Sequence, residues 1–369
     1  MRYGQAAQKP QVLWDGISLV SAINGPVLVD ELVPDMCSAL SSLIEYDADL
    51  GYGACNSFFE AFTSWLLGLA FGGKVAEAAD KWANILRLVL DWEKSSKSAI
   101  HKGTPYYFLG ATYLFGRDFD LGLRYIFDAI EQDKKASTRK GTPGSFKNAP
   151  AYMVASLVED PRNFLYSPLV FPARRRLDGF LESYRAKSTS SMVLKDLESK
   201  FLNNTALEFQ KFLFVYLVFE LIKQETSWNP GFENDFANMR NRAILFDLCL
   251  VIDEVLRNKF PSAKYISDGV FDVFSSKKWL SSEADAGQLN ANLNPKVAGG
   301  PLPDVVVPAL LDLSLTYKGA NISPEMSWYL LAWHLRNYGA HDLKPQAVLV
   351  QRNTEIVQAL MNALFMSLE

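Results

Sequence analysis

Cysteine and histidine are scarce in this sequence, with three residues of each type among 369. The cysteines, Cys37, Cys55 and Cys249, are odd in number, widely spaced and contain no Cys-x-x-Cys pair. Neither a disulfide framework nor a zinc site is therefore expected. Unpaired cysteines are typical of a reducing compartment, so we expect a cytoplasmic protein.

A long apolar run is also absent. The most apolar stretch, 212–222, is interrupted by Glu220 and is bounded by lysines on both sides. It is far shorter than the roughly 20 residues that a transmembrane helix requires, so we expect a buried core helix and no membrane partner. The first 16 residues do not have the pattern of a signal peptide.

The chain has no excess of basic residues. It contains 37 Lys and Arg against 41 Asp and Glu, which gives a net charge of −4. A protein that coats nucleic acid without specificity would be basic, and this class is therefore disfavoured. An enzyme that grips a short stretch of RNA at one local site is still compatible with the composition.

Amphipathic helices dominate the pattern of apolar residues. Apolar side chains recur at spacings of three and four, as in 57–71, 74–94, 242–260 and 354–369. This period is that of the α-helix, whereas the alternating pattern of strands is scarce. The sequence therefore predicts an all-α fold.

Polar linkers suggest two regions. Small hydroxyl residues at 185–192 suit a linker, and we place the boundary between 190 and 191. In the first region, 1–190, the segment 106–130 carries Gly110 and Gly122 at positions where two antiparallel helices could approach closely. This segment resembles a tetratricopeptide repeat (TPR), which implies a TPR-like sensor or dimerisation region; an ordinary helical hairpin is the alternative.

Near the end of the chain, several polar residues interrupt an otherwise apolar helix at 326–343. Arg336, Asn337 and His341 fall within two helical turns, and Gly339 is expected to end the helix and release His341 toward Arg336. A guanidinium presents a rigid fork of donors to phosphate oxygens, and an imidazole can transfer protons near neutral pH. RNA cleavage without a metal requires these two functions.

The segment Arg336-Asn337-Tyr338-Gly339-Ala340-His341 resembles the Arg-x(4–6)-His signature of the HEPN superfamily. The resemblance implies that residues 191–369 form a HEPN-like helical bundle. It also implies a metal-independent endoribonuclease without a cofactor, with a composite site formed by a homodimer. Many members serve prokaryotic antiphage, toxin–antitoxin or CRISPR-linked defence.

Residue roles follow from the same resemblance. Arg336 would orient and stabilise the scissile phosphate, His341 would act as acid or base, and Asn337 would position the 2′-OH or a phosphate oxygen. Arg240, Arg242 and Lys344 are further candidates for contacts with the RNA substrate. A regulatory protein partner could bind through the N-terminal helical region.

Other interpretations of these residues stay open. A pair of cations at a helix end often only compensates the helix dipole. The bundle could then be a non-catalytic HEPN-like interaction module that binds a partner protein or a nucleotide. His334 lies on a different face from Arg336 and is expected to pack or to hydrogen-bond, and His101 is expected to serve loop structure.

Overall fold

The computed structural model describes residues 29–227, 235–280, 289, 303–341 and 346–369. At 225–227, 235–238, 303 and 339–341 it describes the backbone alone. Over these ranges the chain is all-α, as predicted, apart from one short hairpin of β1 (Thr316–Tyr317) and β2 (Ala320–Asn321). Within the described ranges, no helix combines the length and the apolar character that crossing a membrane requires.

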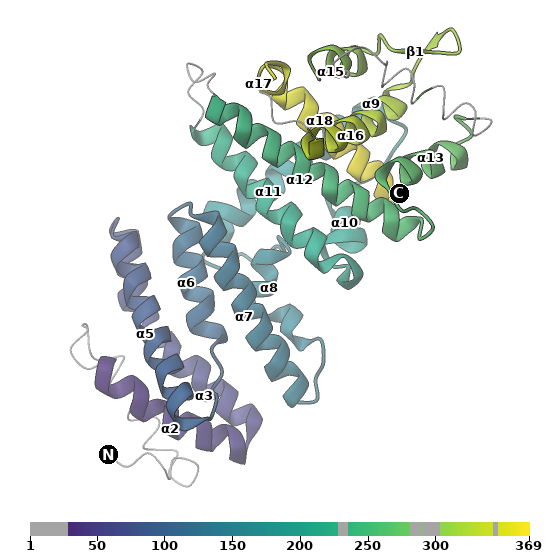
Figure 1. Ribbon diagram of the computed structural model, residues 1–369. Coiled ribbons are helices and arrows are strands. Elements are labelled where there is room, and N and C mark those ends of the chain that lie inside the picture. The colour runs from purple at the N-terminus through teal and green to yellow at the C-terminus, as the bar shows by residue number, and fades with distance from the viewer. Residues whose placement is uncertain (1–28, 228–234, 281–288, 290–302, 342–345) are drawn as a thin grey trace. The chain divides into compact units, whose positions relative to one another are not determined.

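The chain divides into two compact units, Met1–Phe171 and Pro172–Glu369. In the described part of the first unit, helices follow one another along the chain. Figure 1 shows α5, α6 and α7 lying side by side in this unit. Its helices are α2 (Val29–Tyr46), α3 (Ala48–Glu60), α4 (Thr63–Phe71), α5 (Val75–Ser96), α6 (Gly103–Phe115), α7 (Phe119–Arg139), η3 (Ser145–Asn148), α8 (Pro150–Ala155) and η4 (Tyr166–Val170). The single helix predicted over 57–71 is divided between α3 and α4.

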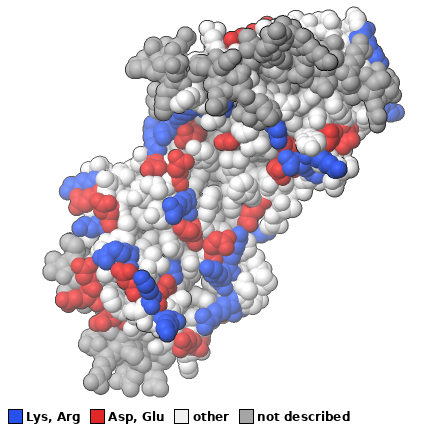
Figure 2. Space-filling view, in the orientation of Figure 1, with Lys and Arg blue, Asp and Glu red and all other residues white. Residues whose placement is uncertain are grey.

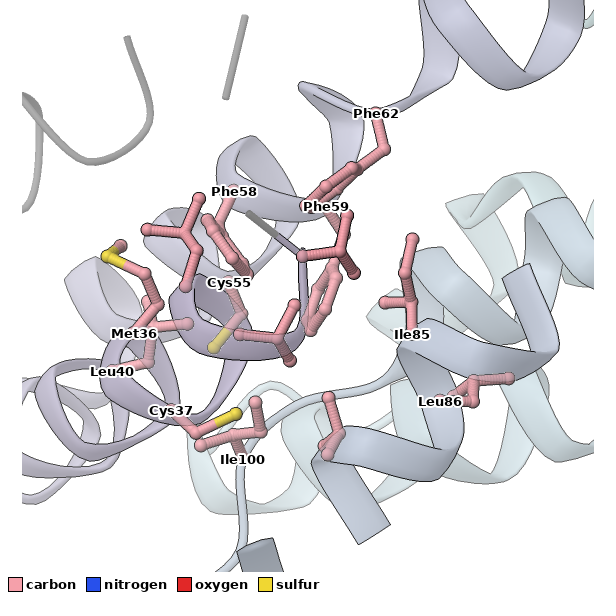
Figure 3. Packing of buried hydrophobic residues seen from close by; sticks show 14 of the residues in the cluster. Met36, Cys37, Leu40, Cys55, Phe58, Phe59, Phe62, Ile85, Leu86 and Ile100 are labelled. Carbon is pink, nitrogen blue, oxygen red and sulfur yellow. The ribbon is translucent and has the colours of Figure 1, made fainter. Parts of the chain in front are cut away.

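Apolar side chains from α2, α3 and α5 form the core of the first unit (Figure 3). The rings of Phe58 and Phe59 pack edge to face with their centroids 5.1 Å apart, and Trp82 stacks on Phe108 with 5.5 Å between the centroids. Cys37 and Cys55 are buried in this core, where burial raises the pKa of the Cys55 thiol to about 12 and that of Cys37 still further. Both thiols therefore stay protonated at neutral pH and pack as small apolar groups.

Two glycines allow α6 and α7 to approach closely. A Cβ atom on Gly110 would lie 2.8 Å from the carbonyl oxygen of Gly122 and 2.9 Å from the backbone nitrogen of Ile126. A Cβ atom on Gly122 would lie 2.6 Å from the side chain of Leu114. The close approach predicted for these two glycines is therefore present in the structure.

The second unit is arranged around α12, which contacts α11, α13, α16, α17 and α18. Its helices are α9 (Phe171–Lys187), α10 (Leu194–Leu197), η5 (Glu198–Leu202), η6 (Thr205–Leu207), α11 (Glu208–Ser227), α12 (Asp235–Lys259), α13 (Ile266–Ser276), α15 (Pro303–Leu311), α16 (Pro324–His341), α17 (Val348–Gln351) and α18 (Asn353–Leu368). Two polar side chains of α12, Asn241 and Asp253, are buried in the interior of this unit.

The division between the units falls at the start of α9, directly after its first residue Phe171, whereas the predicted boundary followed this helix. Tyr184 of α9 packs against Trp328 and Phe365, with ring centroids 5.8 Å away in both cases. Its hydroxyl donates a hydrogen bond of 2.9 Å to Glu369. Because these partners belong to α16 and to the end of the chain, α9 is part of the second unit, and the hydroxyl-rich segment after it is a turn within that unit.

The close approach of α6 and α7 predicts a test by substitution. Gly110→Ala should lower the free energy of unfolding by about 1–3 kcal/mol, because the new methyl group meets backbone atoms that cannot move independently. Gly53→Ala in α3 is the matched control, since nothing lies within 4 Å of its Cβ position. It should stabilise the protein by about 0.5–1 kcal/mol through the higher helix propensity of alanine. Urea denaturation followed by circular dichroism measures both values, and equal effects would contradict the close packing.

Candidate functional site

Helix α16 carries the candidate residues and begins at a well-formed cap. The Ser323 hydroxyl accepts a hydrogen bond of 3.2 Å from the backbone nitrogen of Met326, and Pro324 is the first helical residue. Proline is favoured there because its missing N–H group would have no partner within the helix. The following turns are almost entirely buried, with Tyr329, Leu330 and Leu331 fully enclosed.

Gly339 does not end this helix, contrary to the prediction. The helical backbone continues through Gly339 to His341. A glycine inside a helix costs about 1 kcal/mol relative to alanine, which the packing of a buried helix readily offsets. The five-residue interval from Arg336 to His341 therefore corresponds to a rotation of about 140° and a rise of roughly 7.5 Å. The His341 side chain and Lys344 lie outside the described parts of the chain.

Arg336 lies beside a buried carboxylate on α12. Its Nε is 3.7 Å from Oδ2 of Asp253, whose side chain is 0% exposed. Arg257 occupies both oxygens of this carboxylate: its Nε donates to Oδ1 at 3.0 Å and its Nη2 to Oδ2 at 2.6 Å. Each oxygen of Asp253 thus already accepts a hydrogen bond from Arg257, and the carboxylate attracts Arg336 by charge at a distance that is long for a hydrogen bond.

The N–H groups of the Arg336 guanidinium are not used in hydrogen bonds to Asp253. Its Nε is buried and has no hydrogen-bond partner, and no hydrogen bond joins its Nη atoms to a residue in the described ranges. The side chain is 27% exposed. Arg336 is thus oriented by Asp253 and still able to donate to the oxygens of a ligand.

The neighbours of Arg336 differ in their contacts. Asn337 is half-buried, and its side chain makes no hydrogen bond to a residue in the described ranges. The Arg242 guanidinium lies 5.6 Å from the centroid of the buried Tyr338 ring, so Arg242 is brought alongside α16. Arg240 turns away toward α11, where its Nη2 donates to the buried Glu220 at 2.6 Å.

His334 is buried, in line with its expected packing role. Burial lowers the pKa of its imidazole to about 4, and its Nε2 has no hydrogen-bond partner in the described part of the chain. The ring is therefore neutral at pH 7. Cys249, one turn before Asp253 on α12, is also buried, and burial together with the charge of Asp253 raises the pKa of its thiol. Neither side chain has the properties of a catalytic group.

Sequence reasoning did not find Asp253 and Arg257. Both lie within 242–260, which was interpreted only as an amphipathic helix. A signal was present, because an aspartate enclosed by Val251, Ile252 and Val255 with an arginine four residues later predicts a buried ion pair on one helix face.

The distribution of surface charge and the side chains that could hold a metal ion also bear on the site. On the face shown in Figure 2, acidic and basic side chains are interspersed without a continuous basic stripe. In the described part of the chain, no group of three or more His, Cys, Asp or Glu side chains is arranged to hold a metal ion.

Comparison with known proteins does not identify the chain. No protein-family model matches it, and neither the curated proteins nor the solved structures contain a match.

The buried imidazole predicts acid sensitivity. The folded-state pKa of His334, about 4, lies below its ordinary value of 6.5, so acid protonates the unfolded chain first. The contribution of this residue to stability is complete above pH 6.5 and is lost as the pH falls toward 4. Between pH 7 and pH 4.5 the loss should be roughly 2–3 kcal/mol. Urea denaturation at both pH values should show a smaller loss in His334→Gln than in the unsubstituted protein, whereas identical losses would refute the assignment.

The shared carboxylate predicts a large effect of neutralisation. Asp253→Asn should lower the free energy of unfolding by about 3 kcal/mol, because it removes the carboxylate that faces Arg336 and one of the two that face Arg257, the other being Glu254. Asp247→Asn, on the same helix, is the matched control: burial already raises the pKa of that carboxyl, and neutralising it should change stability by less than about 0.5 kcal/mol. Urea denaturation monitored by circular dichroism compares them, and a larger effect at Asp247 would be inconsistent with this arrangement.

Proposed function

We propose that the protein is a metal-independent endoribonuclease with a HEPN-like C-terminal unit. The observation that carries the proposal is the state of Arg336, which lies beside the buried Asp253, is 27% exposed, and has Nη donors that form no hydrogen bond with a residue in the described ranges. A group that binds a scissile phosphate needs both properties, because it must be positioned before the substrate arrives and must not be saturated by the protein.

The proposed reaction is attack of the ribose 2′-oxygen on the adjacent phosphorus. The new O–P bond forms a 2′,3′-cyclic phosphate, and the bond to the 5′-oxygen breaks. Arg336 stabilises the charge on the phosphate oxygens, and Asn337 donates to a phosphate oxygen or orients the 2′-OH. His341 removes the proton from the 2′-OH or supplies one to the leaving 5′-oxygen.

The proposed site is composite. Along one continuous α16, Arg336 and His341 are about 140° apart, so a single helix does not direct both toward one phosphorus. Two copies of α16 facing each other across a homodimer would let Arg336 of one chain and His341 of the other meet at the same phosphate. Arg242, held beside Tyr338, and Lys344 are proposed to contact the flanking RNA.

The wider role follows from the same proposal. A ribonuclease of this kind fits prokaryotic antiphage, toxin–antitoxin or CRISPR-linked defence in the cytoplasm. The first unit, with its close α6–α7 pair resembling a TPR hairpin, would then serve as a sensor, as a dimerisation platform or as the contact for a regulatory protein.

A second candidate is a non-catalytic interaction module. The ion pair between Arg336 and Asp253 favours it, because an arginine held within the chain can serve structure alone. In that case the bundle would bind a partner protein or a nucleotide. The two candidates differ in what happens to RNA when Arg336 is removed.

The test is cleavage of a mixed RNA pool in EDTA, with mapping of the cleavage ends. The unsubstituted protein should release fragments that end in 2′,3′-cyclic phosphate. Arg336→Ala and His341→Ala should each lower the rate by at least 100-fold, since each removes a group that acts in the transition state. Asn337→Ala should lower it by a smaller factor.

Arg175→Ala is the control, because Arg175 is an exposed arginine on another helix. It should cleave at the unsubstituted rate. Mixing inactive Arg336→Ala with inactive His341→Ala should restore part of the activity, because heterodimers would contain one complete site. Full activity of both single variants would eliminate the ribonuclease and leave the interaction module.

A further inference from the structure

A second site is suggested by a cavity of about 350 Å³ in the first unit. It lies between α3, α6, α7 and η3, and its size is at the lower end of the range for small-molecule pockets. The side chains that decide its chemistry are Tyr52, Asn56, Glu60, His101, Asp133 and Phe146. Three of these residues follow one another at four-residue intervals along α3 and therefore share one helix face.

A buried histidine and an aspartate form one wall. Nε2 of His101 lies 3.2 Å from Oδ1 of Asp133, and the His101 side chain is only 4% exposed. The Tyr52 and His101 rings pack edge to face, with 5.3 Å between their centroids. A Cβ atom on Gly103 would lie 2.6 Å from both paired atoms, so only glycine leaves room for this pair. His101 is thus a constrained part of the cavity and more than a loop residue.

The charges of the cavity are unevenly compensated. His101 faces Asp133, and Nζ of Lys140 lies 3.2 Å from Oδ1 of Asp49. Glu60 is exposed at the edge of the cavity, and partial burial raises the pKa of its carboxyl. Among the charged lining residues in the described ranges, Glu60 is the one that forms no ion pair.

The walls of the cavity are rich in aromatic rings. Tyr52, Tyr107, Phe108 and Phe146 contribute to the lining, and Tyr52 already has the Lys140 ammonium 5.5 Å from its ring centroid. Aromatic faces attract cations, and a carboxylate nearby adds to this preference. The start of α6 has no side-chain cap and would favour an anion, as would the lining residue Lys140. Lys140 is paired with Asp49, however, and Asp133 and Glu60 would repel an anion.

We propose that this cavity binds a small organic cation: an amine on an aromatic body, with its ammonium at Glu60 and its ring against the aromatic wall. The proposal is independent of the ribonuclease proposal, because all of its residues belong to the first unit. Such a ligand would give Glu60 the ion-pair partner that it does not have among the described residues.

Isothermal titration of the full chain with three probes of one shape tests the charge preference. The probes are phenethylamine, 2-phenylethanol and phenylacetate, which share a phenyl ring and differ in the charge at the other end. Phenethylamine should bind at least tenfold more tightly than either of the others. Stronger binding of phenylacetate, equal binding of all three, or no binding of any would overturn the proposal.

Substitution of the carboxylate tests the location. Glu60→Gln should weaken phenethylamine binding at least tenfold and leave 2-phenylethanol unchanged, because only the charged contact is removed. Glu60 is exposed, and circular dichroism should show that the variant stays folded. Glu77→Gln, an exposed glutamate on α5, is the control and should bind phenethylamine as the unsubstituted protein does. Unchanged binding by Glu60→Gln would also refute the proposal.

Discussion

A buried carboxylate organises the second unit. Asp253 lies on α12, the helix around which this unit is packed, and its charge is shared by Arg257 and Arg336. A carboxylate in such a place is unfavourable unless cations surround it, so the fold must bring both arginines to it. The registration of α16 along α12 is therefore determined by electrostatics as well as by apolar packing. The candidate site depends on this pairing, because it orients Arg336 without consuming the donors of its guanidinium.

The fold class could be predicted because it depends on the spacing of apolar residues within each helix, which is local information. The boundary between the units could not, because it depends on contacts between distant residues. The segment 185–192 has the composition of a linker, yet Tyr184 packs against Trp328 and Phe365, far along the chain. The predicted helix end at Gly339 was wrong for the same reason. The local preference of glycine for a helix end was outweighed by the packing of the helix that contains it.

The candidate site, too, could be predicted from the sequence only in part. Arg336 and Asn337 could be selected from the sequence, since a short pattern of polar residues on an apolar helix is visible there. Their partner Asp253 is 83 positions before Arg336 and belongs to another helix. Nothing local connects the two, so the electrostatic environment of Arg336 needed the structure. The pairing of His101 with Asp133 was hidden likewise, because the acid comes from the middle of α7.

The glycine contacts between α6 and α7 also bear on motion. Each helix fills the space that the other leaves, with Gly110 against Gly122 and Ile126. Neither helix can shift without displacing the other, so their amides should open together in hydrogen exchange as one cooperative unit. His101 lies two residues before the start of α6 and Asp133 lies within α7, so the geometry of the cavity is tied to this closely packed pair. A ligand there would meet a preorganised wall and would lose little free energy in ordering it.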